Sequence, residues 1–195
     1  MPITPTTPTA RKDELLDRLV MLFLADGFHG LTLDALAQHL RCSKTTLYSL
    51  GYSKDEVILN TVKHFLRTST EEIERQTANA SNPTDRIVTY LNAVADGLRP
   101  GSQQFYTDLA AHPGTRALYE LNTHVAADRI RQLVTQGVDA GAFRDVHAAF
   151  VADVAATTIA RILAGEVTDR VGLSVVDAFS ELAALILSGI HSNQD

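Results

Sequence analysis

The amino-acid sequence predicts an all-α protein of about nine helices. Apolar residues recur at intervals of three and four along most of the chain, which is the period of a helix packed on one face. Strand signals are few, since apolar and polar residues rarely alternate and the sequence holds no Asn-Gly hairpin turn. Hydrophobic residues make up 45% of the chain and charged residues 21%, an ordinary globular balance. Trp is absent and aromatic residues are only 6%, so the core must be built largely from Leu, Val, Ile and Ala.

The N-terminus, rich in Thr and Pro, predicts a flexible arm over residues 1–10. It lacks the apolar segment of a signal peptide, and no apolar run approaches the roughly 20 residues that span a bilayer. The single cysteine, Cys42, excludes an internal disulfide and fits a reducing compartment. We therefore expect a cytoplasmic protein without a membrane span.

The first helix is expected from residue 11 to about residue 25, followed by Gly27 as a stop. Three more helices begin at hydroxyl N-caps, which are Thr32, Ser43 and Ser53. Glu56 follows the last of these caps by three residues and completes a capping box. Apolar residues flank each cap at the staple positions; the pairs are Leu31 with Leu36, Cys42 with Leu47, and Tyr52 with Val57.

The later helices are longer and are separated by clear breaks. The helix that starts at Ser53 is expected to reach residue 77. Asn82-Pro83 opens the next one, because proline in the first turn loses no hydrogen bond, and Pro100-Gly101 ends it near residue 99. Asp145 is expected to cap the eighth helix and Ser174 the ninth. The remaining expected ranges are about 102–111, 115–139, 145–164 and 174–190.

Residues 32–54 are the most informative segment. Two short helices with separate start signals are joined by a turn of about three residues, which is the pattern of a helix-turn-helix. The second helix of that motif enters the DNA major groove. The sequence therefore predicts an N-terminal three-helix DNA-binding domain over residues 11–52, followed by a longer helical domain over residues 53–195.

The distribution of charge agrees with DNA binding at one end. The net charge is −6, but through Arg67 eight Lys and Arg face seven Asp and Glu, whereas the remainder has nine against sixteen. All four lysines lie in the first third; they are Lys12, Lys44, Lys54 and Lys63. Phosphate repels an acidic body, so only the N-terminal end is expected to face DNA. Chance clustering of a rare residue is the alternative.

Several side chains near the second helix of the motif suit DNA contacts. Lys44, Thr45 and Thr46 are donors for phosphates and base edges, and a threonine methyl can touch a thymine methyl. Tyr48 can reach a phosphate with its hydroxyl. Lys54 lies in a first helical turn, where the dipole disfavours a cation, and a nearby phosphate would explain it. The alternative for each residue is an ordinary polar helix face.

Four short segments carry a resemblance. They are Phe23-x-x-x-Gly27-Phe28, Thr32-x-Asp34-x-Leu36-Ala37, Ser43-Lys44-x-Thr46-Leu47-Tyr48 and Ser53-Lys54. Together they resemble the N-terminal signature of the TetR/AcrR family of transcription regulators, over about residues 11–66. Residues 105–165 loosely resemble the ligand-binding region of AcrR-type members. The resemblance implies an all-helical homodimer with three helices on DNA and a six-helix regulatory core. It places at DNA the residues Thr32, Ser43, Lys44, Thr45, Thr46, Tyr48 and Lys54.

The chain departs from the family pattern at two positions. Arg41 stands in the turn where the family usually has glycine; it offers a further phosphate contact but strains a turn that favours glycine. Gly51 replaces an aromatic residue, which removes a packing anchor between the second helix of the motif and the helix after Ser53. Tyr52, as a staple residue, is the candidate to compensate.

The last two expected helices are apolar around more than one face, which indicates pairing with a second copy in a four-helix interface. The alternative is a pair of internal core helices. Two copies on a pseudo-palindromic operator would also read enough base pairs for specificity. The expected interface residues are Phe150, Val154, Thr158, Ile162, Phe179, Leu182, Ile186 and Ile190.

A ligand pocket in a helical bundle is mostly apolar with a few polar anchors. The candidate anchors are His64, Tyr90, Tyr106, His112, Tyr119, Asn122 and His124; each could equally be a surface residue or a core residue whose polar group already has a partner.

Glu120, His124 and Asp128 share one helix face, where a solvated surface is favoured over a metal site. We expect no metal and no cofactor. The usual catalytic motifs and phosphate loops are absent and Cys42 has no evident His partner, so no catalytic residues and no enzyme are expected.

These observations predict a transcriptional regulator that responds to a ligand. We expect a homodimeric repressor that binds a DNA operator and is released by a small molecule. One alternative keeps the fold but acts as an activator or under the control of a partner protein. The other is a helical ligand-binding or enzymatic bundle whose DNA-binding domain has degenerated, as Arg41 and Gly51 hint.

Overall fold

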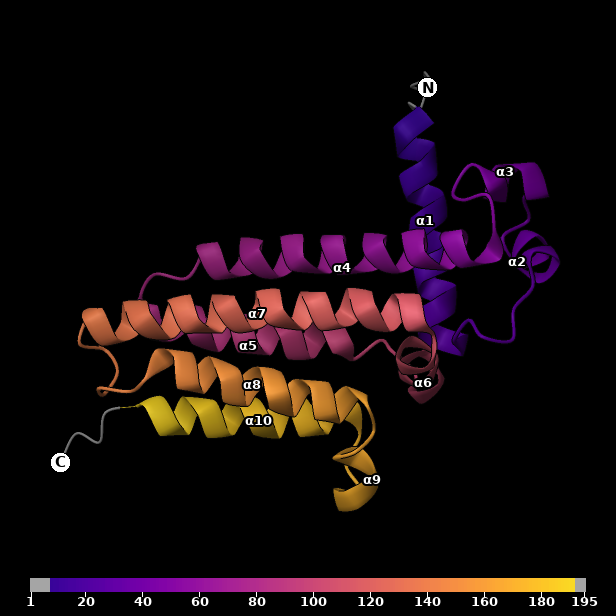
Figure 1. Ribbon diagram of the computed structural model, residues 1–195. Coiled ribbons are helices and arrows are strands. Elements are labelled where there is room, and N and C mark those ends of the chain that lie inside the picture. Colours follow the sequence, from indigo (N-terminus) through magenta and orange to yellow (C-terminus); the bar gives the residue numbers. More distant parts are fainter. Residues whose placement is uncertain (1–7, 192–195) are drawn as a thin grey trace.

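The computed structural model describes residues 8–191 and folds them into ten helices (Figure 1). The N-terminal domain contains α1 (Pro8–Asp26), α2 (Leu33–His39) and α3 (Lys44–Tyr48). The body contains α4 (Lys54–Ala78), α5 (Pro83–Leu98), α6 (Gln103–Ala111), α7 (Pro113–Asp139), α8 (Ala148–Leu163), α9 (Thr168–Val171) and α10 (Val175–Ile190). The all-α prediction is confirmed. Residues 1–7 of the expected arm lie outside the described residues, and α1 takes in the last three residues of that arm.

The long helices of the body lie side by side, and the N-terminal domain sits at one end of them. Figure 1 shows α1 crossing the start of α4, with α2 and α3 beyond that end and α6 beside the base of α1. The helices α8 and α10 form the layer farthest from α4. This arrangement separates the helix-turn-helix from the apolar C-terminal helices.

The predicted side-chain caps are present at the starts of five helices. Thr32, Ser43, Ser53, Asn82 and Ser174 each accept a hydrogen bond from the backbone N–H three residues later. Each bond satisfies a donor that a helix start leaves without a partner, which stabilises the helix by about 1 kcal/mol. These caps fix where the helices begin.

The cap predicted at Asp145 is wrong. The helix α8 begins at Ala148, and the Nδ1 atom of His147 accepts from the N–H of Phe150 at 3.2 Å. Asp145 is kept out of the helix because the preceding loop pairs with the end of α10: Arg144 N–H donates to the Ile190 carbonyl at 3.1 Å.

The short helix α9 was not predicted from the sequence, because four residues carry too little periodicity to be recognised.

The N-terminal helices and the body share one hydrophobic core. The predicted apolar face of α1 is buried, with Leu19 and Phe23 almost fully enclosed. Phe28 contacts Phe23 and Phe105 with ring centroids 5.2 Å and 6.3 Å apart, so an aromatic cluster joins α1 to α6. Over residues 8–191, no helix combines the length and apolar character that a membrane crossing needs.

Candidate nucleic-acid interface

The helix-turn-helix presents a polar surface on an apolar base. Leu36 and Leu47 are each 1% exposed and anchor α2 and α3 in the core. All eight residues predicted to contact DNA lie on α2, its cap, the turn, α3 or the start of α4, and all except the half-buried Lys54 are exposed. They are Thr32, Arg41, Ser43, Lys44, Thr45, Thr46, Tyr48 and Lys54.

The two hydroxyls at the start of α3 are organised by each other. The Ser43 Oγ accepts from the N–H of Thr46 at 3.1 Å and lies 2.8 Å from the Thr46 hydroxyl. Thr45, next to them, makes no side-chain hydrogen bond within the described residues and is free to contact a base or phosphate. The start of α3 therefore offers one held threonine hydroxyl and one unengaged one.

Lys44 forms an ion pair with Asp34 of α2. Its Nζ lies 2.6 Å from the Asp34 carboxylate of α2, and this hydrogen bond raises the pKa of Lys44. Both side chains are more than half exposed, so the pair contributes little to stability. The contact holds the ammonium group of Lys44, at the start of α3, against α2.

Lys54 has a partner within the chain. Its Nζ donates to the His29 carbonyl at 3.0 Å, which links α4 to the loop between α1 and α2. This bond accounts for a positively charged side chain in the first turn of α4, so no DNA phosphate is needed to explain its position. An ammonium group has three N–H donors, so the contact leaves two for DNA.

Both departures from the family pattern have clear structural consequences. Arg41 has φ 50°, a left-handed conformation that costs any residue with a Cβ, so the expected strain in the turn is present. A Cβ on Gly51 would approach the Glu56 Cβ to 2.6 Å, so a larger residue would force the start of α4 to shift. The expected compensation by Tyr52 is wrong: its side chain is 90% exposed and does not staple Val57. Glu56 instead accepts from the Tyr52 N–H at 2.7 Å.

The helices α8 and α10 enclose an apolar groove of about 560 Å³ on the surface. Six of the eight residues predicted at a dimer interface line it: Phe150, Val154, Thr158, Leu182, Ile186 and Ile190. Ile162 and Phe179 do not line it and are 2% and 3% exposed. Leu182, Ile186 and Ile190 form the buried floor of the groove, and Phe150 and Val154 are its exposed members from the predicted set. Leu185, 70% exposed on the groove, was not among the predicted residues although it continues their helical stripe.

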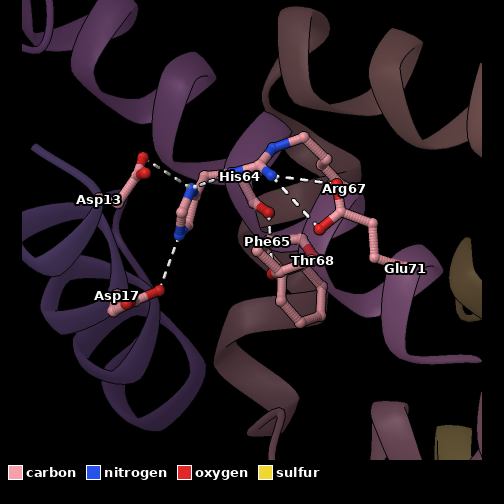
Figure 2. A network of polar contacts seen from close by, with 7 residues as sticks. All are labelled: Asp13, Asp17, His64, Phe65, Arg67, Thr68 and Glu71. Carbon is pink, nitrogen blue, oxygen red and sulfur yellow. Dashed lines mark hydrogen bonds and ion pairs between the residues drawn. The ribbon is translucent and has the colours of Figure 1, made fainter. Parts of the chain in front are cut away.

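The predicted ligand anchor His64 belongs to the junction between α1 and α4 (Figure 2). Its Nε2 lies 2.7 Å from the Asp17 carboxylate of α1, and its Nδ1 lies 3.1 Å from an Arg67 guanidinium nitrogen. Since a guanidinium can only donate, Nδ1 accepts from Arg67 and Nε2–H donates to Asp17. Asp13 is a more distant second carboxylate, 3.9 Å from Nδ1. The imidazole thus holds α1 on α4 and is not open to a pocket.

The other ligand candidates are not gathered in one site. The Tyr90 hydroxyl donates to the Ala126 carbonyl at 3.4 Å, and the Tyr106 hydroxyl donates to the Leu98 carbonyl. His112 caps α7 through the N–H of Thr115. Asn122 is half-buried, and His124 is exposed on a groove between α7 and α8. Three of these five candidates therefore have structural partners.

Tyr119 borders a smaller pocket than Tyr106 and His124, whose pockets measure about 390 Å³ and 580 Å³. It lines a cavity of about 100 Å³ between α6, α7 and α8, with Arg116, Glu120 and Leu109. Burial raises the pKa of Tyr119, as it does for Tyr90 and Tyr106, so the phenol stays neutral and can donate a hydrogen bond. Within residues 8–191, the helix face of Glu120 forms no cluster of three side chains suited to a metal.

No protein-family model matches the sequence. The HTH-type transcriptional regulator HbdR from Aromatoleum sp. (strain CIB) is 22% identical over 142 residues. That alignment covers 71% of this chain but spans only 62% of the length of HbdR.

Similar solved structures extend over nearly the whole chain. A transcriptional regulator from Saccharomonospora viridis, solved with choline, matches with a TM-score of 0.75 at 18% identity, covering 95% of this chain and 100% of that one. A TetR-family regulator from Agrobacterium tumefaciens matches with a TM-score of 0.71 at 15% identity, again over 95% and 100%. A TetR regulator from Chloroflexus aurantiacus J-10-FL matches with a TM-score of 0.68 at 17% identity, over 94% and 97%.

The order and packing of the helices, with a helix-turn-helix near the N-terminus, are those of these solved structures. In particular, the chain has the fold of TetR-family regulators, and the resemblance predicted from the sequence is confirmed for that fold.

Proposed function

We propose that this chain is a TetR-family transcriptional regulator that binds a pseudo-palindromic DNA operator as a homodimer. The observation that carries the proposal is the exposed polar surface of α3, held on buried leucines at the end of the molecule where the lysines gather. Ser43, Lys44, Thr45, Thr46 and Tyr48 supply phosphate and base-edge donors there. We assign it no enzymatic activity and a cytoplasmic location.

The groove between α8 and α10 supports the dimer. Phe150 and Leu185, at 66% and 70% exposed, stand on a surface lined mainly by apolar side chains. Exposed apolar side chains gathered in one groove favour a protein partner, and a second copy with the same groove can bury them symmetrically. The proposed interface consists of the groove residues of α8 and α10, with Leu185 added to the predicted set.

We further propose that a small molecule releases the operator. The cavity beside Tyr119 is smaller than the usual 300–1,000 Å³ of ligand pockets, so a ligand entering there must push its walls apart. Leu109 and Ala110 of α6 form one wall, and α6 also contacts the N-terminal domain. Ligand and operator would then favour different positions of α6, which couples their affinities by the same factor in both directions.

Selection of bound fragments from genomic DNA by the purified full chain, at near-physiological salt, tests the proposal. Enrichment of one pseudo-palindrome supports both DNA binding and the dimer, and the neighbouring genes would narrow the choice of ligand. Repression or activation is then read from a reporter placed behind that operator. Failure to enrich any sequence would instead favour a ligand-binding or enzymatic bundle with a degenerate DNA-binding domain.

Two sets of variants separate positioning contacts from sequence recognition. Lys54→Ala is expected to weaken binding to all DNA sequences alike. It should also reduce the slope of log affinity against log salt concentration by about 1, which corresponds to the loss of one phosphate contact. Thr45→Ala or Thr46→Ala is expected to change the preferred sequence. Unchanged affinity of K54A at physiological salt would remove Lys54 from the proposed interface and leave it as a link to His29.

A further inference from the structure

A buried carboxylate of the body holds the loop that leads into the DNA-binding helices. Asp108 of α6 is only 4% exposed. Its Oδ2 accepts from two successive backbone N–H groups, Phe28 at 2.6 Å and His29 at 2.8 Å, and its Oδ1 accepts from Gln104 at 2.6 Å. The bonds to Phe28 and His29 reach across 80 and 79 residues of sequence, and hydrogen bonds to a carboxylate are among the stronger ones.

The loop is shaped to admit this carboxylate. Gly27 has φ 75°, which turns the next two N–H groups toward α6, and a Cβ at this position would lie 2.5 Å from the Asp108 Oδ2. Glycine is therefore required both for the backbone conformation and for the close approach. Three residues beyond His29, the loop reaches Thr32, the cap of α2. The position of the loop consequently sets where the first helix of the helix-turn-helix begins.

Other contacts fix the same loop to the body. Lys54 of α4 donates to the His29 carbonyl, on the peptide unit that follows the one held by Asp108. The Phe28 ring packs edge-on against Phe105 of α6 and His112 at the start of α7, with both centroid distances at 6.3 Å. The loop is thus held through its N–H groups, its carbonyl and its aromatic ring by three helices of the body.

We propose that Asp108 is a positioning residue for DNA binding, which sets the orientation of α2 and α3 from α6. The inference rests on the proposed function. Asp108 directly precedes Leu109, a wall of the cavity beside Tyr119, so a displacement of α6 moves the carboxylate and the loop together. In a dimer, this motion changes the separation of the two groove-reading helices, which must match the half-site spacing of the operator.

The test compares D108A, D108N and the wild type as full chains. D108A leaves the buried N–H group of Phe28 and the partly buried one of His29 without their carboxylate partner. D108N keeps the shape: its amide oxygen can accept from both N–H groups while Gln104 turns its own carbonyl toward the new amide. V134A is the matched control, because Val134 is fully buried on α7 and its truncation destabilises the body without touching the loop.

Three quantities are measured: amide hydrogen exchange at Phe28 and His29, affinity for the genomically selected operator, and discrimination against operators whose half-sites are one base pair closer or farther apart. D108A is expected to exchange both amides at least tenfold faster, to bind at least tenfold more weakly and to lose most of its spacing discrimination. D108N is expected to recover most of each property. V134A is expected to unfold at a lower temperature than the wild type but to keep the wild-type preference for half-site spacing.

The outcomes separate the two proposals. Wild-type spacing discrimination in folded D108A would overturn the positioning role while leaving operator binding intact. Equal loss of discrimination in V134A would also overturn it, because general destabilisation would then account for the effect. Absence of any selected operator for the wild type would overturn the proposed function and, with it, the inference.

Discussion

The N-terminal domain and the body organise their polar side chains in different ways. In the helix-turn-helix, Thr32 and Ser43 accept hydrogen bonds from backbone N–H groups only three residues away. In the body, polar side chains bond across helices: His64 reaches Asp17 over 47 residues, and Tyr90 reaches the Ala126 carbonyl over 36. Helix starts are therefore set by local bonds, as at Asn82 and Ser174 of the body too, whereas contacts between helices join residues that are distant in the sequence. Substitutions at a cap and at a cross-helix contact should have effects of different range.

The largest effect is expected from a charge in the groove of α8 and α10. Leu185→Glu should convert the dimer to a monomer and reduce operator affinity more than a hundredfold, because a carboxylate would be buried at the interface without a partner. Gel filtration with light scattering and operator titration measure the two results. The side chain is 70% exposed in the protomer, so the variant should fold normally.

Leu121→Glu is the matched control for L185E. Leu121 is 62% exposed on α7 and does not line the groove. The same charge there should therefore leave both the mass of the dimer in solution and the operator affinity unchanged. Dimerisation of L185E at wild-type strength would place the interface elsewhere on the molecule.

A smaller effect, on stability, is expected inside the N-terminal domain. Gly51→Ala should lower the free energy of unfolding by about 1–3 kcal/mol, because its Cβ would overlap Glu56 and the backbone of Val57. Gly30→Ala is the control, since nothing lies within 4 Å of a Cβ there and its φ is not positive. Urea unfolding measures both. Equal stability of the two variants would mean that the start of α4 can shift to accommodate the Cβ without lowering the free energy of unfolding.

This difference in range explains which parts of the fold were predictable from the sequence. Caps such as Ser43 and Asn82 act within one helical turn, so the sequence alone located the starts of their helices. The start of α8 was misplaced because the conformation near Asp145 depends on Arg144 pairing with Ile190, which is distant in the sequence. Asp108 was missed for the same reason, since nothing near it in sequence indicates that it binds the loop at Phe28.

The candidate sites follow the same division. Exposed polar residues of a short capped helix, such as Thr45, remain candidates for DNA contacts because exposure follows from the helix-turn-helix pattern. The ligand candidates were chosen by residue type, and residue type does not reveal whether a hydroxyl such as that of Tyr106 already has a backbone partner. A period of 3.6 also marks Ile162 and Phe150 alike, although one faces the core and the other solvent.

The next effect in size concerns the turn before α3, where local strain and function oppose each other. Arg41→Gly should raise the free energy of unfolding by about 1 kcal/mol, because glycine adopts the left-handed conformation without cost. The same change should weaken operator binding if the guanidinium contacts phosphate, as proposed. Arg41→Ala separates the two effects, since it removes the side chain but keeps the strain. Higher affinity of R41G than of the wild type would exclude Arg41 from the interface.

The smallest effect is expected at Tyr52. The staple pattern predicts that its loss should destabilise the start of α4, but the side chain is 90% exposed and only its backbone N–H is engaged, by Glu56. Tyr52→Ala should therefore change the free energy of unfolding by no more than about 0.5 kcal/mol. Glu56→Ala is the informative comparison, because it removes the partner of that N–H and should cost more. A loss of stability in Y52A as large as that in E56A would show that the ring packs in solution, and that local pattern outweighs tertiary exposure even at this position.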